Sequence, residues 1–188
     1  MNMGRLNGKI IAIAVVALLV IWGIGSYNGL VSKSEKINET YSQIQNQLQR
    51  RADLIPNLVE TVKGYAKQEK EVIQSVTDAR AKLAGARTPQ EQAAANNELN
   101  SALSRLLVVV ENYPNLKSDA NFRQLMDELA GTENRIAVAR KDYNAAVKEY
   151  NVKIKRFPTV IIARIFGFTE KQYFEANPNA QNAPNVKF

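Results

Sequence analysis

The apolar residues of the chain form one unbroken run near its start and periodic sets after it. Residues 10–25 contain no charged side chain. At 1.5 Å per residue a helix of this length covers about 24 Å, somewhat less than the roughly 30 Å of a bilayer core. Lys9 suits the interface before the run, and Trp22 and Tyr27 suit the interface after it. We therefore predict a transmembrane helix over residues 10–26.

A cleaved signal peptide is the alternative interpretation of this run, because Gly23 and Gly25 form a small-x-small pattern of the kind found at cleavage sites. An uncleaved anchor is favoured, because the run leads directly into a helical repeat without a turn-rich break. That repeat places residues on one seam at heptad spacing and predicts a first bundle helix over residues 28–52. The seam residues are Leu30, Ser34, Ile37, Tyr41, Ile44 and Leu48.

A second helix is predicted over residues 54–84. Asp53 can act as its N-cap, and Pro56 falls in its first turn, where a missing N–H group costs little. Its apolar spacing keeps one face buried, through Leu58, Val62, either Glu69 or Val72, Val76, Ala79 and Leu83. The alternative is that Pro56 only kinks a longer helix.

Two more helices are predicted in the second half of the chain. Thr88 and Glu91 form a capping box, which predicts a helix over residues 88–112. The last helix is predicted over residues 118–156. Its seam repeats every seven residues, at Phe122, Leu129, Ile136, Tyr143, Tyr150 and Phe157. The chain is therefore predicted to be all-α, with the transmembrane helix followed by an antiparallel up-down four-helix bundle over residues 27–157.

Positive charge is concentrated at the two ends of the chain. Of the formal net charge of +7, a short basic tail over residues 1–9 contributes +2, residues 27–147 contribute +1 and residues 148–171 contribute +4. The basic stretch overlaps residues 158–175, which are apolar at their centre and too short to span a bilayer. Residues 176–188 have the composition of a flexible tail.

Residues 158–175 combine apolar side chains with cations, which is typical of a segment that lies in a membrane interface. This interpretation makes lipids, including anionic ones, the partners of Lys153, Lys155, Arg156, Ile161, Arg164, Ile165 and Phe166. The alternative is that the isoleucines fold back over the open end of the bundle and cap its core.

The sequence lacks the usual side chains of catalytic and metal sites. It has no cysteine and no histidine, so disulfides, thiolate ligands and imidazole bases are excluded. The Glu-x-x-His motif of di-metal bundles cannot occur, and no phosphate-binding loop or nucleophile elbow appears. We expect no cofactor, no metal and no enzymatic activity. The nearly neutral middle of the chain argues against a nucleic-acid partner.

Four charged residues are candidates for a register-fixing or partner-binding role. Glu133 and Arg140 lie at the margin of the last helical seam. They either occupy a solvated rim or form a buried polar network with Arg50, Arg51 or Glu60. The pair Arg50 and Arg51 either docks an acidic partner or complements the C-terminal end of the first helix.

Residues 47–66, Q-L-Q-R-R-A-D-L-I-P-N-L-V-E-T-V-K-G-Y-A, resemble the signature of the bacterial LemA family. The resemblance extends to residues 27–28, 113–117, 133–140, 143–144, 150–151, 167–168 and 173–175. A histidine that is usual in the family a few residues after Gly-Tyr-Ala is absent, and Gln68 precedes Glu69 here. The resemblance implies a single-pass membrane protein with an antiparallel helical-bundle domain.

Two functions follow from these patterns. The first is a membrane-anchored helical scaffold of the bacterial envelope that self-associates. The second is a regulatory adaptor whose bundle binds one envelope protein, an enzyme or a sensor. The expected location is the bacterial plasma (inner) membrane. Arg5 and Lys9 place the N-terminus in the cytoplasm by the positive-inside rule, and the bundle is then extracytoplasmic.

Overall fold

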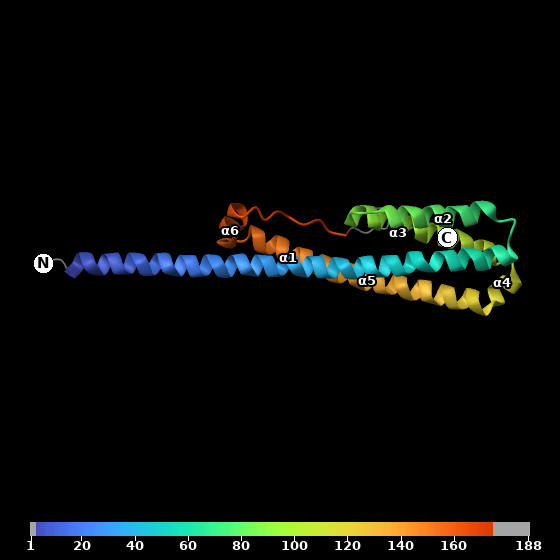
Figure 1. The fold of residues 1–188 in the computed structure, drawn as a ribbon, viewed down its shortest axis with the longest axis horizontal. Coiled ribbons are helices and arrows are strands. Elements are labelled where there is room, and N and C mark those ends of the chain that lie inside the picture. The colour runs from blue at the N-terminus through green and yellow to red at the C-terminus, as the bar shows by residue number, and fades with distance from the viewer. Residues whose placement is uncertain (1–2, 175–188) are drawn as a thin grey trace, which may run out of the picture. The chain divides into compact units, whose positions relative to one another are not determined.

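The computed structural model describes residues 3–174, with side chains from residue 8 onward, and each regular element in this part of the chain is a helix (Figure 1). The helices are α1 (Met3–Tyr65), α2 (Lys70–Gly85), α3 (Pro89–Val110), α4 (Pro114–Ser118), α5 (Ala120–Lys155) and α6 (Thr159–Ile165). The predicted all-α class, with a long apolar helix at the N-terminus followed by a helical bundle, is confirmed. The predicted tail over residues 176–188 lies outside the described residues.

The described residues form two units. The anchor unit consists of the chain up to Glu39 together with residues 145–171, and the bundle unit consists of residues 40–144 together with 172–174.

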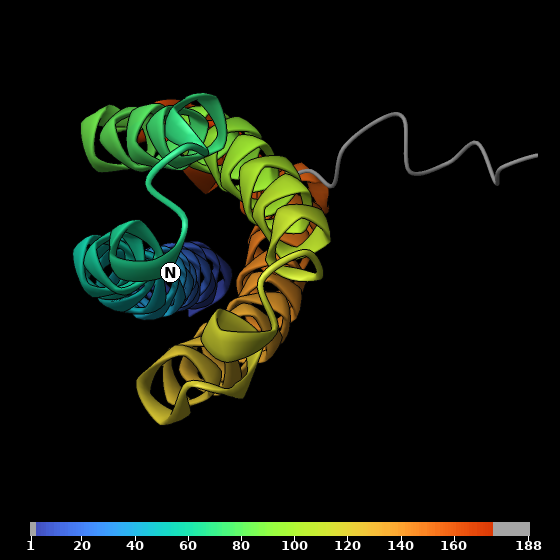
Figure 2. The same cartoon turned by 90° about the vertical axis from the view of Figure 1, so that its right-hand side faces the viewer.

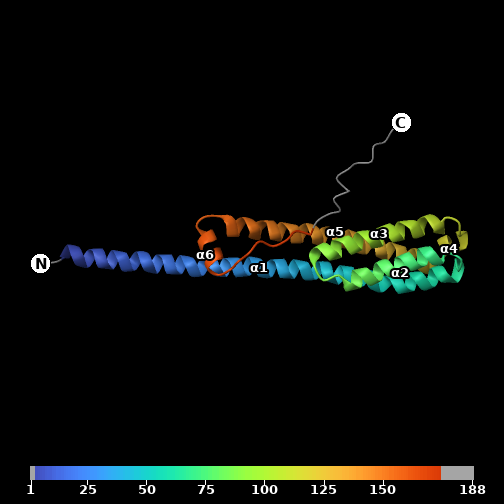
Figure 3. The same ribbon diagram turned by 90° about the horizontal axis from the view of Figure 1, so that it is seen from above.

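In the bundle unit the end of α1, the hairpin of α2 and α3, and the start of α5 lie side by side, and successive long helices run in opposite directions (Figures 2 and 3). The core contains most of the seam residues predicted from the sequence for these helices, because that spacing keeps one face of each helix turned inward. Tyr41 and Val72 are exceptions and are only half-buried. Its most buried members include Ile44, Leu58, Val76, Leu99, Leu129 and Ile136.

The predicted division between helices 28–52 and 54–84 is wrong. Asp53 is not an N-cap, because α1 continues past it to Tyr65 and carries Pro56 inside the helix. A proline in this position leaves the carbonyl four residues earlier without its usual N–H donor. That carbonyl belongs to Ala52, and the Nε–H of Arg80 in α2 donates to it at 2.8 Å. The helix therefore tolerates the proline because another helix supplies the missing donor.

The connection between α1 and α2 falls at residues 66–69 instead. Tyr113, between α3 and α4, donates a hydrogen bond to Glu69 at 2.8 Å. This bond joins the α1–α2 connection to the α3–α4 connection. Ala66 is buried within the α1–α2 connection. A tertiary contact is therefore present where the chain reverses direction. The sequence pattern placed this reversal at Asp53, thirteen residues too early.

The predicted helices 88–112 and 118–156 correspond to α3 and α5. The capping box is present, with the Glu91 N–H donating to the Thr88 hydroxyl at 3.2 Å and the Thr88 N–H donating to the Glu91 carboxylate at 3.1 Å. Five of the six seam residues of α5 are buried, and Phe157 is not, since it lies beyond the end of the helix and is 81% exposed. The short helix α4 was not predicted.

Residues 172–174 run along α5 within the bundle unit. The side-chain amide of Asn144 donates to the Phe174 carbonyl at 3.0 Å and accepts from the Phe174 N–H at 2.8 Å. Tyr143 donates to the Gln172 carbonyl at 2.9 Å. Phe174 is thereby buried, and the chain is held against the bundle through its backbone.

In the anchor unit the N-terminal part of α1 packs beside the end of α5 and α6, and its core includes Leu30, Val147 and Tyr150. The residues of the apolar run are exposed, and α1 is long and apolar enough to cross a membrane. Asn151 makes the same pair of hydrogen bonds that Asn144 makes with Phe174. Its side-chain amide donates to the Lys171 carbonyl at 2.8 Å and accepts from the Lys171 N–H at 2.9 Å.

Candidate functional site

A cluster of polar side chains lies inside the bundle unit around Arg51 of α1, whose side chain is only 4% exposed. Its guanidinium donates to Glu133 of α5 and to the carbonyl oxygens of Asn96 and Asn100, both of α3. The amides of Asn96 and Asn100 in turn donate to Glu133, at 3.4 and 3.3 Å. Arg140 completes the cluster, 3.5 Å from the same carboxylate. We call these five residues the buried network.

Burial lowers the pKa of Arg51 below its ordinary value, because the charged guanidinium has lost its hydration there. The neighbouring Glu133 carboxylate opposes this effect, whereas the second cation, Arg140, adds to it. The Nε–H of Arg51 has no partner among the described residues. The network thus joins α1, α3 and α5 through hydrogen bonds from one buried cation.

The structure brings three of the four charged candidates together. Arg51, Glu133 and Arg140 belong to the buried network, whereas Arg50 points to the surface and Glu60 pairs with Lys63. The side chains of Glu133 and Arg140 are both partly exposed.

Asn96 and Asn100 were not predicted from the sequence. A sequence pattern could have predicted them, because Gln92, Asn96 and Asn100 follow one another at four-residue spacing beside the apolar positions of α3. Asn96 has no exposed surface, and Gln92 is also buried. Buried polar side chains need partners. Those of Asn96 and Asn100 are on α1 and α5, whereas Gln92 donates to the Ala86 carbonyl at 3.4 Å.

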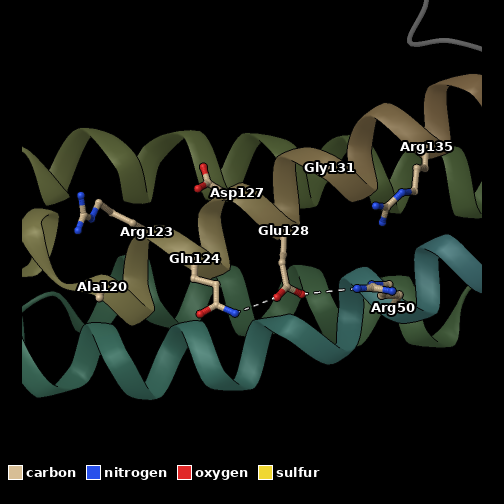
Figure 4. A pocket seen from close by; sticks show the side chains of 8 residues that line it. All are labelled: Arg50, Ala120, Arg123, Gln124, Asp127, Glu128, Gly131 and Arg135. Atoms are coloured by element: carbon tan, nitrogen blue, oxygen red, sulfur yellow. Dashed lines mark hydrogen bonds and ion pairs between the residues drawn. The ribbon is translucent and has the colours of Figure 1, made fainter.

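Arg50 lines an open hollow between α1 and α5. Figure 4 shows its side chain facing Glu128 from the opposite helix, and the Arg50–Glu128 nitrogen–oxygen distance is 3.7 Å. Gln124 also donates to Glu128, at 3.4 Å. Arg123, Asp127 and Arg135 complete the charged lining.

A second hollow lies between the same two helices and shares Arg135 with the first. Its other lining residues are mostly amides and carboxylates: Gln43, Asn46 and Gln47 of α1, and Asn134, Val138, Ala139 and Asp142 of α5. We call the two hollows together the α1–α5 groove. It holds three arginines and three acidic residues, so its charges balance.

The residues predicted to contact the membrane lie in the anchor unit. Lys9 is exposed, and Trp22 and Tyr27 are partly exposed along α1. The predicted lipid-facing residues Ile161, Ile165 and Phe166 are exposed as well. Of the predicted cations, Lys153 is partly exposed and Lys155, Arg156 and Arg164 are exposed, with Lys155 paired to Glu170 at 2.8 Å.

A model of the LemA family matches residues 40–188. The chain belongs to the LemA family. The match begins at the residue with which the bundle unit begins and includes all five residues of the buried network.

Curated proteins show the same relationship. The LemA-family chain is 29% identical to the magnetosome proteins MamQ 1 and MamQ 2 of Paramagnetospirillum magneticum, over 94% of this chain and 76% of each relative. It is 24% identical to the protein LemA of Metamycoplasma hominis, over 82% of this chain and 71% of that relative. Family membership and the apolar N-terminal part of α1 together indicate a membrane-associated protein.

Proposed function

We propose that this LemA-family protein is a non-catalytic, membrane-anchored scaffold that self-associates through the α1–α5 groove of its bundle unit. The observation that carries the proposal is the balance of charge in that groove, with three arginines and three acidic residues on one open surface. The apolar part of α1 supplies the anchor, and the plasma (inner) membrane is its proposed location.

A balanced surface suits association of identical chains. In a twofold symmetric pair each patch faces a copy of itself, so every cation must find its anion on the same patch. Arg50, Arg123 and Arg135 are matched in number by Asp127, Glu128 and Asp142. Val138, an exposed apolar residue in the same groove, provides apolar surface whose burial in an interface would be favourable.

The second candidate is an adaptor that binds one envelope protein. The half of the groove around Arg50 favours it, because three arginines there face only two acidic residues, Asp127 and Glu128. An acidic segment of a partner would complement that surplus. This function shares the anchor and the bundle with the first and differs in the occupant of the groove.

The bundle unit is proposed to be extracytoplasmic, on the charge argument from Arg5 and Lys9. Protease treatment of intact spheroplasts tests this orientation. Cleavage within the bundle is expected, and a bundle protected until the membrane is permeabilised would reverse the assignment.

Sizing of the full chain in mild detergent, with mass determined by light scattering, tests self-association. Val138→Arg introduces a charge into the groove, and Val108→Arg, at an equally exposed valine of α3 outside it, is the matched control. We expect an oligomer for the unsubstituted chain and for Val108→Arg, and a smaller particle for Val138→Arg. A monomeric unsubstituted chain would exclude the scaffold and leave the adaptor.

A further inference from the structure

The α6 region exposes an apolar surface that the bundle does not use. Ile161 and Ile165 of α6 and the flanking Phe157 and Phe166 are all exposed, with Ile165 at 68%. These residues lie within ten positions of one another, so the patch is local. Soluble surfaces rarely keep contiguous apolar patches of large side chains without a partner.

The other face of α6 packs on the apolar part of α1. A methyl group added at Gly23 would lie 3.7 Å from the Cδ1 atom of Ile162, so the glycine lets the two helices approach closely. Phe166, which follows α6, takes part in this contact and is still 58% exposed: its ring lies 4.8 Å from that of Tyr27, centre to centre. An apolar hollow between the two helices is lined from the α1 side by Val16, Leu19, Val20, Gly23, Ile24 and Tyr27.

This contact sets the depth of α6 relative to a membrane that α1 crosses. Gly23 lies two residues before the end of the apolar run at residue 25, a separation of about 3 Å along the helix axis. Side chains that pack on Gly23 and Tyr27 therefore lie at the boundary between hydrocarbon and headgroups. Ile161 and Ile165 are one and three residues from Ile162 along α6, so they lie close to this contact.

Cations accompany this apolar face. Arg156 and Arg164 are exposed and belong to no ion pair among the residues with described side chains. Free guanidinium groups next to an apolar face at this depth are suited to the phosphates of anionic lipids, and salt weakens such attraction.

We propose that α6, with Phe157 and Phe166, is an interfacial segment that inserts into an anionic leaflet beside the point where α1 leaves the bilayer. The proposal rests on the proposed membrane anchoring of α1 and is independent of what occupies the α1–α5 groove. The protein then touches the membrane at two places, a spanning helix and a short helix lying in the interface.

Site-directed spin labelling of the full chain tests the proposal directly, since the chain has no native cysteine. Single variants Ile165→Cys, Leu19→Cys and Val108→Cys are labelled and reconstituted into vesicles of phosphatidylcholine with or without phosphatidylglycerol. Leu19 reports on the anchor, and Val108 of α3, exposed like Ile165, is the aqueous control. Accessibility to oxygen, which concentrates in lipid, is compared with accessibility to a water-soluble nickel chelate.

With phosphatidylglycerol present, the label at position 165 is expected to show a several-fold higher oxygen-to-nickel ratio than the label at position 108. Combined Arg156→Gln and Arg164→Gln substitutions should lower that ratio in anionic vesicles and should not change it in neutral ones. A ratio at position 165 equal to that at position 108 overturns the proposal.

Low accessibility to both reagents at position 165 also overturns it, because a second protein surface would then cover α6. An unchanged ratio in the arginine variant removes the role of anionic lipid. If position 19 is aqueous too, the anchor itself fails and both proposals fall. A lipid-exposed position 19 with an aqueous position 165 refutes the α6 proposal alone.

Discussion

The α1 helix continues through Pro56 because another helix supplies a hydrogen-bond donor. This predicts how substitution of Arg80 changes the unfolding free energy, with Pro56 present and with Pro56 replaced. Arg80→Met keeps the aliphatic part of the side chain and removes the Nε–H that donates to the Ala52 carbonyl at 2.8 Å. Ala52 is only 2% exposed, so water cannot readily replace that donor. Leaving a buried carbonyl unsatisfied is expected to cost about 1–3 kcal/mol of unfolding free energy.

Pro56→Ala restores an N–H at the position that normally bonds the Ala52 carbonyl. In this background Arg80 is no longer needed, and Arg80→Met should cost less than about 0.5 kcal/mol, as for an ordinary surface change. The coupling between the two substitutions is therefore expected to be about 1–2 kcal/mol. Pro56→Ala alone should stabilise the chain by about 1 kcal/mol, since the gain in helix propensity exceeds the lost restriction of the unfolded chain.

The assay is urea unfolding of the full chain in detergent micelles, followed by far-ultraviolet circular dichroism for the two single variants, the double variant and the unsubstituted chain. Arg105→Met, at an exposed arginine of α3, controls for the loss of a surface charge. If Arg80→Met costs the same in both backgrounds, the carbonyl is not what Arg80 stabilises, and the explanation for the continuous helix is wrong.

The buried network, the α3 capping box and the amide contact to Phe174 can be tested in the same way. Glu133→Gln should lower the unfolding free energy by about 3 kcal/mol in urea titrations, because it leaves a buried guanidinium without its anion; a loss near zero would mean that the asparagines alone satisfy it. The pKa of Glu91 lies below its ordinary value of 4.5, chiefly because the Arg87 backbone N–H donates to the carboxylate. The unfolded chain therefore binds a proton first as the pH falls, so this stabilisation is complete above the unfolded pKa and is lost as the pH falls through the folded pKa. Glu91→Gln should flatten that part of the stability curve, and an unchanged slope would contradict the assignment. Asn144→Ala should speed amide hydrogen exchange at Phe174, whose N–H it accepts at 2.8 Å; unchanged exchange would show that other contacts hold the segment.

Much of the fold was predictable from the sequence because it depends on local signals. Heptad spacing identified the buried face of α5, from Phe122 to Tyr150, and the Thr88–Glu91 capping box located the start of α3. Both signals act within a few residues along one helix, so no knowledge of other helices was needed. The apolar run of α1 was equally evident, since its length and lack of charge are properties of the sequence alone.

Other features depended on side chains that meet only after the helices pack. Pro56 predicts a helix start when read locally, and the Arg80 donor that lets α1 continue comes from a helix that folds back beside it. The buried network likewise unites Arg51 with Asn96 across separate helices. Periodicity determined which faces of the chain turn inward, and tertiary packing decided which polar groups those faces bring together, because a hydrogen bond depends on positions in space rather than on spacing along the chain.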